Sequence, residues 1–112
     1  MKQPEAKLLQ VVTTCATRDE AERIGEALVT ARLAGCVQIH SPITSIYRWQ
    51  GHIERNEEWL LAIKTVPPMF DAVAAAIRQQ HSYQTPQIIG LPIVEGSEDY
   101  VAWLREQVAT EQ

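Results

Sequence analysis

The sequence predicts one α+β domain in which a strand, a helix, two strands, a helix and a strand are followed by a final helix. Three observations predict it. Short apolar runs rich in β-branched residues alternate with stretches of helical apolar spacing. Gly51 separates two long arms that both have strand composition. A third helical stretch ends the chain. The order βαββαβ is that of the ferredoxin-like sandwich, an antiparallel sheet with two helices on one face, here with an extra C-terminal helix.

Length and charge set the broad class. At 112 residues the chain is expected to form a single domain over residues 1–112. Its ten basic and fourteen acidic side chains give a net charge of −4. That sign argues against nucleic acid or an anionic membrane as the main partner, because both need clustered Lys and Arg. The N-terminal apolar stretch is too short and polar for a signal peptide, so a cytoplasmic protein is expected.

The first strand and helix have clear boundaries. Residues 7–16 form an apolar run suited to a buried strand. Thr17 and Glu20 fit a capping box, in which Thr17 caps the helix and Glu20 reaches back to the cap residue. Gly35 is the expected C-cap after Ala34. The apolar stripe of this helix is Ala21, Ile24, Leu28 and Ala31.

The next element is a hairpin with arms at residues 36–50 and 52–66, which is the extended hairpin between the second and third strands of the fold. Pro42 predicts a bulge or edge position in the first arm. An arm of roughly 15 residues reaches on the order of 50 Å, whereas a compact chain of this length has a radius of gyration of about 13 Å. The hairpin should therefore project, and another copy of the chain is the expected cover for its apolar tip residues Ile46, Tyr47, Trp49 and Ile53.

The second half of the chain completes the order. Pro67 and Pro68 end the second arm and can open a helix whose stripe runs from Phe70 to Ile77. A polar loop, residues 81–86, leads into a strand over residues 87–94, and a terminal amphipathic helix follows.

The two cysteines are expected to be reduced. Cys15 ends the first strand, and Cys36 begins the next one after a helix. A strand-helix-strand unit places these positions at opposite ends of the sheet, beyond the Cα separation of about 7 Å that a disulfide allows.

The topology predicts one place for chemistry. The last strand runs antiparallel to the first, so Cys15 and His81 should approach one another, with Tyr83 nearby. A thiolate and an imidazole suit copper or zinc ions. Two alternatives stay open: Cys15 is a small buried hydrophobe beside a hydrogen-bonded loop histidine, or the pair forms a nucleophile, for which the sequence identifies no orienting third group.

An RNA-binding role is excluded by charge. RNA-recognition modules of this fold place aromatic residues among basic ones. Here Tyr47 and Trp49 lie among Glu54, Glu57 and Glu58.

The chain resembles the CutA family, the divalent-cation tolerance proteins. The resemblance extends from about residue 9 to residue 105 and is carried by Cys36-Val37-Gln38-Ile39, Pro42, Ser45, Tyr47, Trp49, Gly51, Glu58, Ile63-Lys64-Thr65, residues 81–86 and residues 100–104. It implies a ferredoxin-like homotrimer whose hairpins wrap neighbouring subunits, similar in architecture to the PII signalling proteins.

The resemblance also implies a site. Copper binding in the family is attributed to a cysteine that ends the first strand and to a histidine before the tyrosine-containing loop, and these correspond to Cys15 and His81. This chain departs from the family pattern at Gln80, where some members have a second histidine, and at Gln84, where others have a carboxylate.

Three functional hypotheses follow. The first is a non-enzymatic, trimeric, cytoplasmic protein of the response to metal ions that binds copper through Cys15 and His81. The second is a PII-like signalling module that binds a small anionic ligand between subunits through Lys64 and Tyr83. The third is a small trimeric enzyme that uses Glu58, Lys64 and His81.

Overall fold

The computed structural model describes residues 5–109 and confirms the predicted α+β, ferredoxin-like fold. The predicted second strand is divided in two by residues 40–42, as Pro42 led us to expect. The elements are β1 (Leu8–Cys15), α1 (Arg18–Thr30), β2 (Cys36–Ile39), β3 (Ile43–Trp49), β4 (His52–Thr65), the 3-10 turn η1 (Pro67–Met69), α2 (Phe70–Gln80), β5 (Ile89–Ile93) and α3 (Glu98–Gln107).

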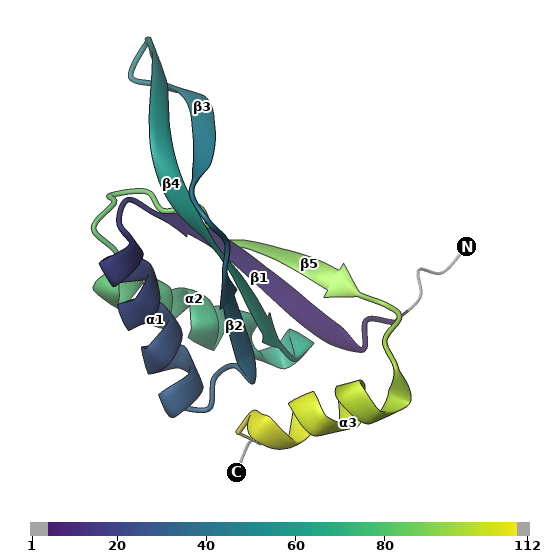
Figure 1. The fold of residues 1–112 in the computed structure, drawn as a ribbon. Coiled ribbons are helices and arrows are strands. Elements are labelled where there is room, and N and C mark those ends of the chain that lie inside the picture. The colour runs from purple at the N-terminus through teal and green to yellow at the C-terminus, as the bar shows by residue number, and fades with distance from the viewer. Residues whose placement is uncertain (1–4, 110–112) are drawn as a thin grey trace.

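The sheet is antiparallel, with the order β2-β4-β1-β5, and β3 extends the sheet by pairing with β4. Val11 lies opposite Ile63 on one side and Gly90 on the other, so β1 is central. The helices α1 and α2 lie together on one face (Figure 1). The core lies between this face and the helices, and its buried residues are Val11, Cys15, Ala21, Ile24, Leu28, Ala34, Leu61, Ile63, Val73 and Ile77.

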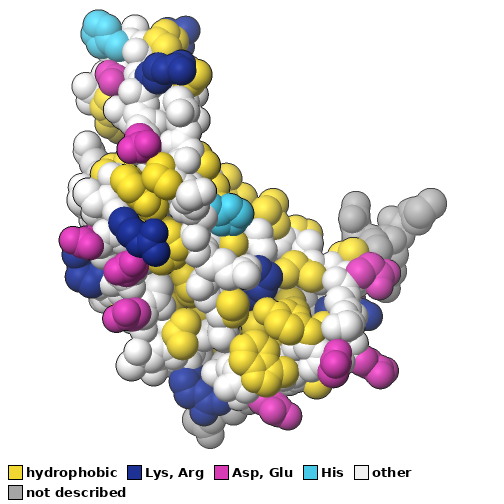
Figure 2. Space-filling model, viewed as in Figure 1, with side chains coloured by type: hydrophobic (Ala, Val, Ile, Leu, Met, Phe, Trp, Pro, Cys, Tyr) yellow, Lys and Arg dark blue, Asp and Glu magenta, His cyan; other side chains and the backbone are white. Residues whose placement is uncertain are grey.

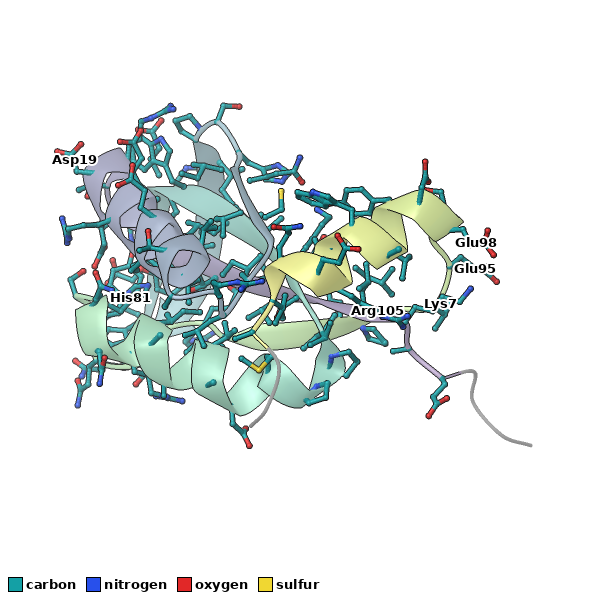
Figure 3. The ribbon with its side chains drawn as sticks, turned by 90° about the horizontal axis from the view of Figure 1, so that it is seen from below. Lys7, Asp19, His81, Glu95, Glu98 and Arg105 are labelled. Atoms are coloured by element: carbon teal, nitrogen blue, oxygen red, sulfur yellow. The ribbon has the colours of Figure 1, made fainter. Side chains whose placement is uncertain are left out.

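The C-terminal helix α3 packs against the other face near the start of β1, where Leu104 and Val101 form a second cluster with Leu8. The Arg105 guanidinium donates a hydrogen bond to the Lys7 carbonyl oxygen at 3.1 Å, and Figure 3 shows the two residues together at this end of the molecule. Helix α3, which is additional to the βαββαβ fold, is thus fixed to the sheet by both apolar and polar contacts.

The expected C-cap at Gly35 is wrong. Helix α1 ends at Thr30, and Arg32 takes the left-handed conformation with φ 61°. Arg32 is held there because its Nε donates to the Gln107 carbonyl oxygen at 2.9 Å. A Cβ on Gly35 would lie 2.9 Å from Leu104 Cγ, so a glycine is needed there for the close approach of α3.

The hairpin projects beyond the body of the protein, as predicted (Figure 1). Gln50 and Gly51 both have positive φ, 50° and 84°, and form the two-residue turn between Trp49 and His52. The radius of gyration is 14.9 Å and the extents are 44 × 37 × 25 Å. Hydrophobic side chains on the hairpin stand among charged ones in Figure 2. Ile46 and Ile53 remain 61% and 64% exposed.

The two cysteines are free and far apart. Cys15 lies opposite Trp59 and Cys36 opposite Lys64, five residues apart along β4. At about 3.3 Å per residue this separation is far beyond what a disulfide spans. In residues 5–109 no helix is long and apolar enough to cross a membrane.

Candidate functional site

The structure brings Cys15 and His81 together at the end of β1. Cys15 is the last residue of that strand and its side chain is buried in the core. His81 follows α2 with an extended backbone, φ −84° and ψ 139°, which directs the chain away from the helix. The Cys15 Sγ and His81 Nε2 atoms are 3.9 Å apart. Figure 3 shows His81 at the end of the molecule where α1 begins.

Hydrogen bonds determine the tautomer of His81. The backbone N–H of Tyr83 donates to Nδ1 at 3.1 Å, so Nδ1 carries no proton in the neutral ring. Nε2 therefore bears the proton and donates it to the Thr14 carbonyl oxygen at 2.7 Å. The imidazole side chain is fully buried. In this arrangement His81 links the loop after α2 to the end of β1.

Glu20 has a role that the sequence did not reveal. Thr17 caps α1 by accepting from the Glu20 N–H at 3.1 Å, as expected. The Glu20 carboxylate, however, does not reach back to the cap. It is buried and accepts from the Ser82 N–H at 2.6 Å and the Ser82 hydroxyl at 3.2 Å. One of its oxygens lies 3.9 Å from His81 Nδ1. The spacing of residues could have indicated that Glu20 is buried. Glu20 lies four and eight residues before Ile24 and Leu28, on the buried stripe of the helix.

Glu58 and Tyr83 form a second buried link. The Tyr83 hydroxyl donates to Glu58 Oε2 at 2.6 Å, and the Tyr83 ring lies 4.7 Å from the imidazole ring of His81. Burial, and then the hydrogen bond to Glu58, raise the pKa of Tyr83 above its ordinary value. The loop after α2 is thereby attached to β4 as well as to β1 and α1.

The environment keeps the Cys15 thiol protonated at neutral pH. Burial, followed by the nearby Glu20 and Glu58 carboxylates, raises the pKa of Cys15 from 9.0 to about 12. A reactive cysteine needs the opposite shift, because the thiolate is the nucleophile. Glu20 lies 3.9 Å from Nδ1, but in this tautomer Nδ1 has no proton to donate to it, so Glu20 does not orient the ring. The burial and protonation of the thiol further disfavour nucleophilic chemistry.

Raising the pH above 9 is expected to destabilise the wild-type protein more than a Cys15→Ala variant. The thiol ionises near pH 9 in the unfolded chain and near pH 12 in the folded one. Its stabilising contribution is complete below pH 9 and is lost as the pH rises toward 12, with a slope approaching about 1.4 kcal/mol per pH unit. Urea unfolding with reductant at pH 8, 9 and 10 measures this difference. Parallel pH dependences of the two proteins would contradict the assignment.

Lys64 lies away from Cys15, His81 and Tyr83. It is six residues from Glu58 along β4, a separation of about 20 Å at 3.3 Å per residue. Its Nζ donates to Gln38 Oε1 at 2.7 Å. Within one protomer the fold therefore does not bring Lys64 to Tyr83 or to His81.

A groove of about 670 Å³ opens beside Tyr83, between the hairpin and the loop after α2. Two carboxylates and three aromatic side chains line it, and no Lys, Arg or His does. This composition favours a cation over an anion. The lining residues are Thr14, Ser45, Ile46, Tyr47, Trp49, Glu54, Glu58, Tyr83, Gln84, Thr85 and Gln87.

Among the described residues, no group of three or more His, Cys, Asp or Glu side chains is arranged to hold a metal ion. The Cys15–His81 pair supplies two donors. A metal bound there would need to complete its coordination with other groups.

Comparisons with known proteins agree on one family. Residues 9–107 match the family model described as CutA1 divalent ion tolerance protein. The chain is 43% identical over 96 residues to the divalent-cation tolerance protein CutA of Thermus thermophilus, covering 86% of this chain and 93% of that protein. It is 39% identical over 93 residues to human Protein CutA, covering 83% of this chain and 52% of the human protein.

Solved structures give the same result. The structure of the periplasmic divalent cation tolerance protein CutA from Archaeoglobus fulgidus matches with a TM-score of 0.88 and 35% identity, over 91% of this chain and 99% of that one. The chain spans nearly all of the archaeal and Thermus proteins but about half of the human one.

Proposed function

Because this chain belongs to the CutA1 family of divalent ion tolerance proteins, we propose that it acts in the response to metal ions by binding copper at Cys15 and His81. The observation that carries the proposal is the approach of a thiol and an imidazole to 3.9 Å from segments far apart in the sequence. The role in divalent-cation tolerance is proposed from the names of its relatives. Copper is proposed over zinc because nitrogen and sulfur ligands generally bind Cu²⁺ more tightly than Zn²⁺.

The spacing of the two donors fits a single bound ion. In zinc sites the metal lies about 2.3 Å from sulfur and about 2.0 Å from nitrogen, which places two tetrahedral ligands roughly 3.5 Å apart. The Sγ–Nε2 distance of 3.9 Å is close to that value. Thiolate and imidazole together favour copper over the hard cations calcium and magnesium.

Binding requires the pair to release one proton and to move another. The Cys15 thiol must ionise, and His81 Nε2 must exchange its proton with Nδ1. Glu20 lies 3.9 Å from Nδ1 and is placed to accept a hydrogen bond from a proton there. Because the Tyr83 N–H donates to Nδ1 in the present arrangement, the loop after α2 has to shift. We therefore expect weak binding that strengthens as the pH rises.

Titration with Cu(II) under anaerobic conditions tests the proposal. Cys15→Ala and His81→Ala are each expected to reduce the affinity at least tenfold, because each removes one of two protein ligands. Cys36→Ala and His52→Ala are matched controls, since they remove a thiol and an imidazole outside the pair and should bind as the wild type does. Equal affinities in all five proteins would exclude Cys15 and His81 as ligands.

We further propose that the protein is a homotrimer in which neighbouring copies cover the hairpin face that carries Ile46 and Ile53. The support is the projecting hairpin, on which Ile46 and Ile53 are more than half exposed. Arg48 and Arg55 share this face of the hairpin with them by register. Burial of an isoleucine contributes roughly 1.5–3 kcal/mol, which gives a cyclic assembly a favourable contact at each interface.

The cytoplasm is the compartment we propose, because it keeps free thiols such as Cys15 and Cys36 reduced. We propose a binding protein rather than an enzyme, since the Cys15 thiol is buried and its pKa is raised. The PII-like alternative, an anionic ligand held by Lys64 and Tyr83, would require these residues to come from different subunits, and the groove beside Tyr83 carries carboxylates instead of cations.

A further inference from the structure

Most of the hairpin residues that line the groove beside Tyr83 share one face of the hairpin, and Ile46, from the opposite face, is the exception. In the β3–β4 register Tyr47 lies opposite Glu54, and side chains two residues apart on a strand share a face. Tyr47, Trp49, Glu54 and Glu58 therefore all belong to the groove face. The loop after α2 closes the other side with Tyr83.

Both arginines of the hairpin lie on the same face. Glu54 and Glu58 lie on the groove face, whereas Arg48, Arg55 and Glu57 lie on the opposite face. The groove is thus a negative site with aromatic walls and no basic side chain of this protomer lining it. Aromatic faces attract ammonium groups as carboxylates do, so both features of the lining favour a cation.

Glu58 differs from a surface carboxylate because it is buried and held in place by a hydrogen bond from Tyr83. The residue is only 6% exposed. Tyr83 donates to Oε2 at 2.6 Å, and within residues 5–109 no hydrogen bond is made to Oε1. A buried carboxylate that keeps one oxygen available at the wall of a groove is a ready acceptor for a cationic donor.

The spacing of the carboxylates identifies the class of cation. Glu54 and Glu58 are four residues apart on β4, about 13 Å at 3.3 Å per residue. One metal ion cannot bind both, because metal–oxygen distances are about 2.0–2.6 Å. A flexible chain with an ammonium group at each end can bind both, while Tyr47 and Trp49 contact its methylene and ammonium groups. We propose that this groove binds an extended aliphatic polyamine.

Calorimetric titration of the full, assembled protein with spermidine at physiological salt tests this proposal. Glu54→Gln and Glu58→Gln are each expected to weaken spermidine binding about fivefold or more, since each removes a charged acceptor. Trp49→Ala is expected to weaken it about threefold through loss of a cation–π contact. Putrescine, which is too short to reach both carboxylates, should bind at least about fivefold more weakly than spermidine.

Glu57→Gln is the matched control. It removes the same charge from the same strand, but Glu57 lies on the opposite face and should leave spermidine affinity within about twofold. Light scattering on the same samples verifies that the variants assemble alike. Equal losses in Glu57→Gln and Glu54→Gln, or no heat with wild type at millimolar spermidine, would overturn the proposal. Cys15 and His81 do not line the groove, so its failure leaves the copper proposal untouched.

Discussion

Replacing Ile53 with Glu is expected to dissociate the proposed trimer into monomers. Ile53 is 64% exposed in the protomer, and the proposed assembly buries it against a neighbouring copy. The change removes roughly 1.5–3 kcal/mol of apolar burial at every interface and adds the cost of desolvating a carboxylate there. Light scattering measures the mass directly, and thermal unfolding should occur at a lower temperature that depends on protein concentration.

Val29→Glu is the matched control for that experiment. Val29 is an exposed apolar residue on α1, 43% exposed, and lies away from the hairpin. This variant should keep the mass of the wild type. If Ile53→Glu also keeps a three-chain mass, the hairpin face that carries Ile46 and Ile53 is not the interface.

Glu20→Ala is expected to lower the free energy of unfolding by about 2–4 kcal/mol. The carboxylate accepts two hydrogen bonds from Ser82, and its loss leaves the part-buried Ser82 N–H without a partner. The loop after α2 would then lose its attachment to α1, and His81 its neighbouring carboxylate. Urea unfolding at neutral pH measures the change.

Two further variants distinguish loss of the Glu20–Ser82 hydrogen bonds from the general effect of removing a carboxylate from α1. Glu20→Gln keeps one acceptor oxygen and should recover part of the lost stability. Glu22→Ala removes an exposed carboxylate that pairs with Arg18 on the same helix and should cost no more than about 0.5 kcal/mol. A Glu20→Ala variant as stable as Glu22→Ala would show that the Ser82 contacts contribute little.

In the wild type, hydrogen bonds to three different elements hold the loop after α2 in place. Glu20, Thr14 and Glu58 hold successive residues of the loop that begins at His81. For the proposed ion to bind Cys15 and His81, at least one of the contacts of this loop would have to be displaced, the Tyr83 N–H bond to Nδ1 among them.

Features that depend on local sequence were predicted well. The strand and helix order, the turn at Gly51, the break near Pro42 and the cap at Thr17 all arise from properties of a few neighbouring residues. The proximity of Cys15 and His81 was also predicted, because antiparallel pairing of the first and last strands places their opposite ends together.

Features that depend on contacts between distant segments were not predicted. Gly35 looked like a helix cap, but its position is set by Leu104, which is far away in the sequence. Glu20 fitted a capping box, yet the loop after α2 presents a stronger donor in the Ser82 N–H. Local sequence patterns show which hydrogen-bond partners lie nearby along the chain. They carry no information on residues from distant segments that compete for the same group.

Periodicity, turn residues and the order of motifs are properties of the sequence, so they were sufficient to predict the secondary structure, the topology, the projecting hairpin and the family. The arrangement of the site depends on the folded structure, which sets the tautomer of His81, the burial that raises the pKa of Cys15, the contacts of Glu20 and the groove between hairpin and loop. Hydrogen bonding and desolvation depend on all atoms within a few ångströms, and those atoms come from residues that the chain brings together only when it folds.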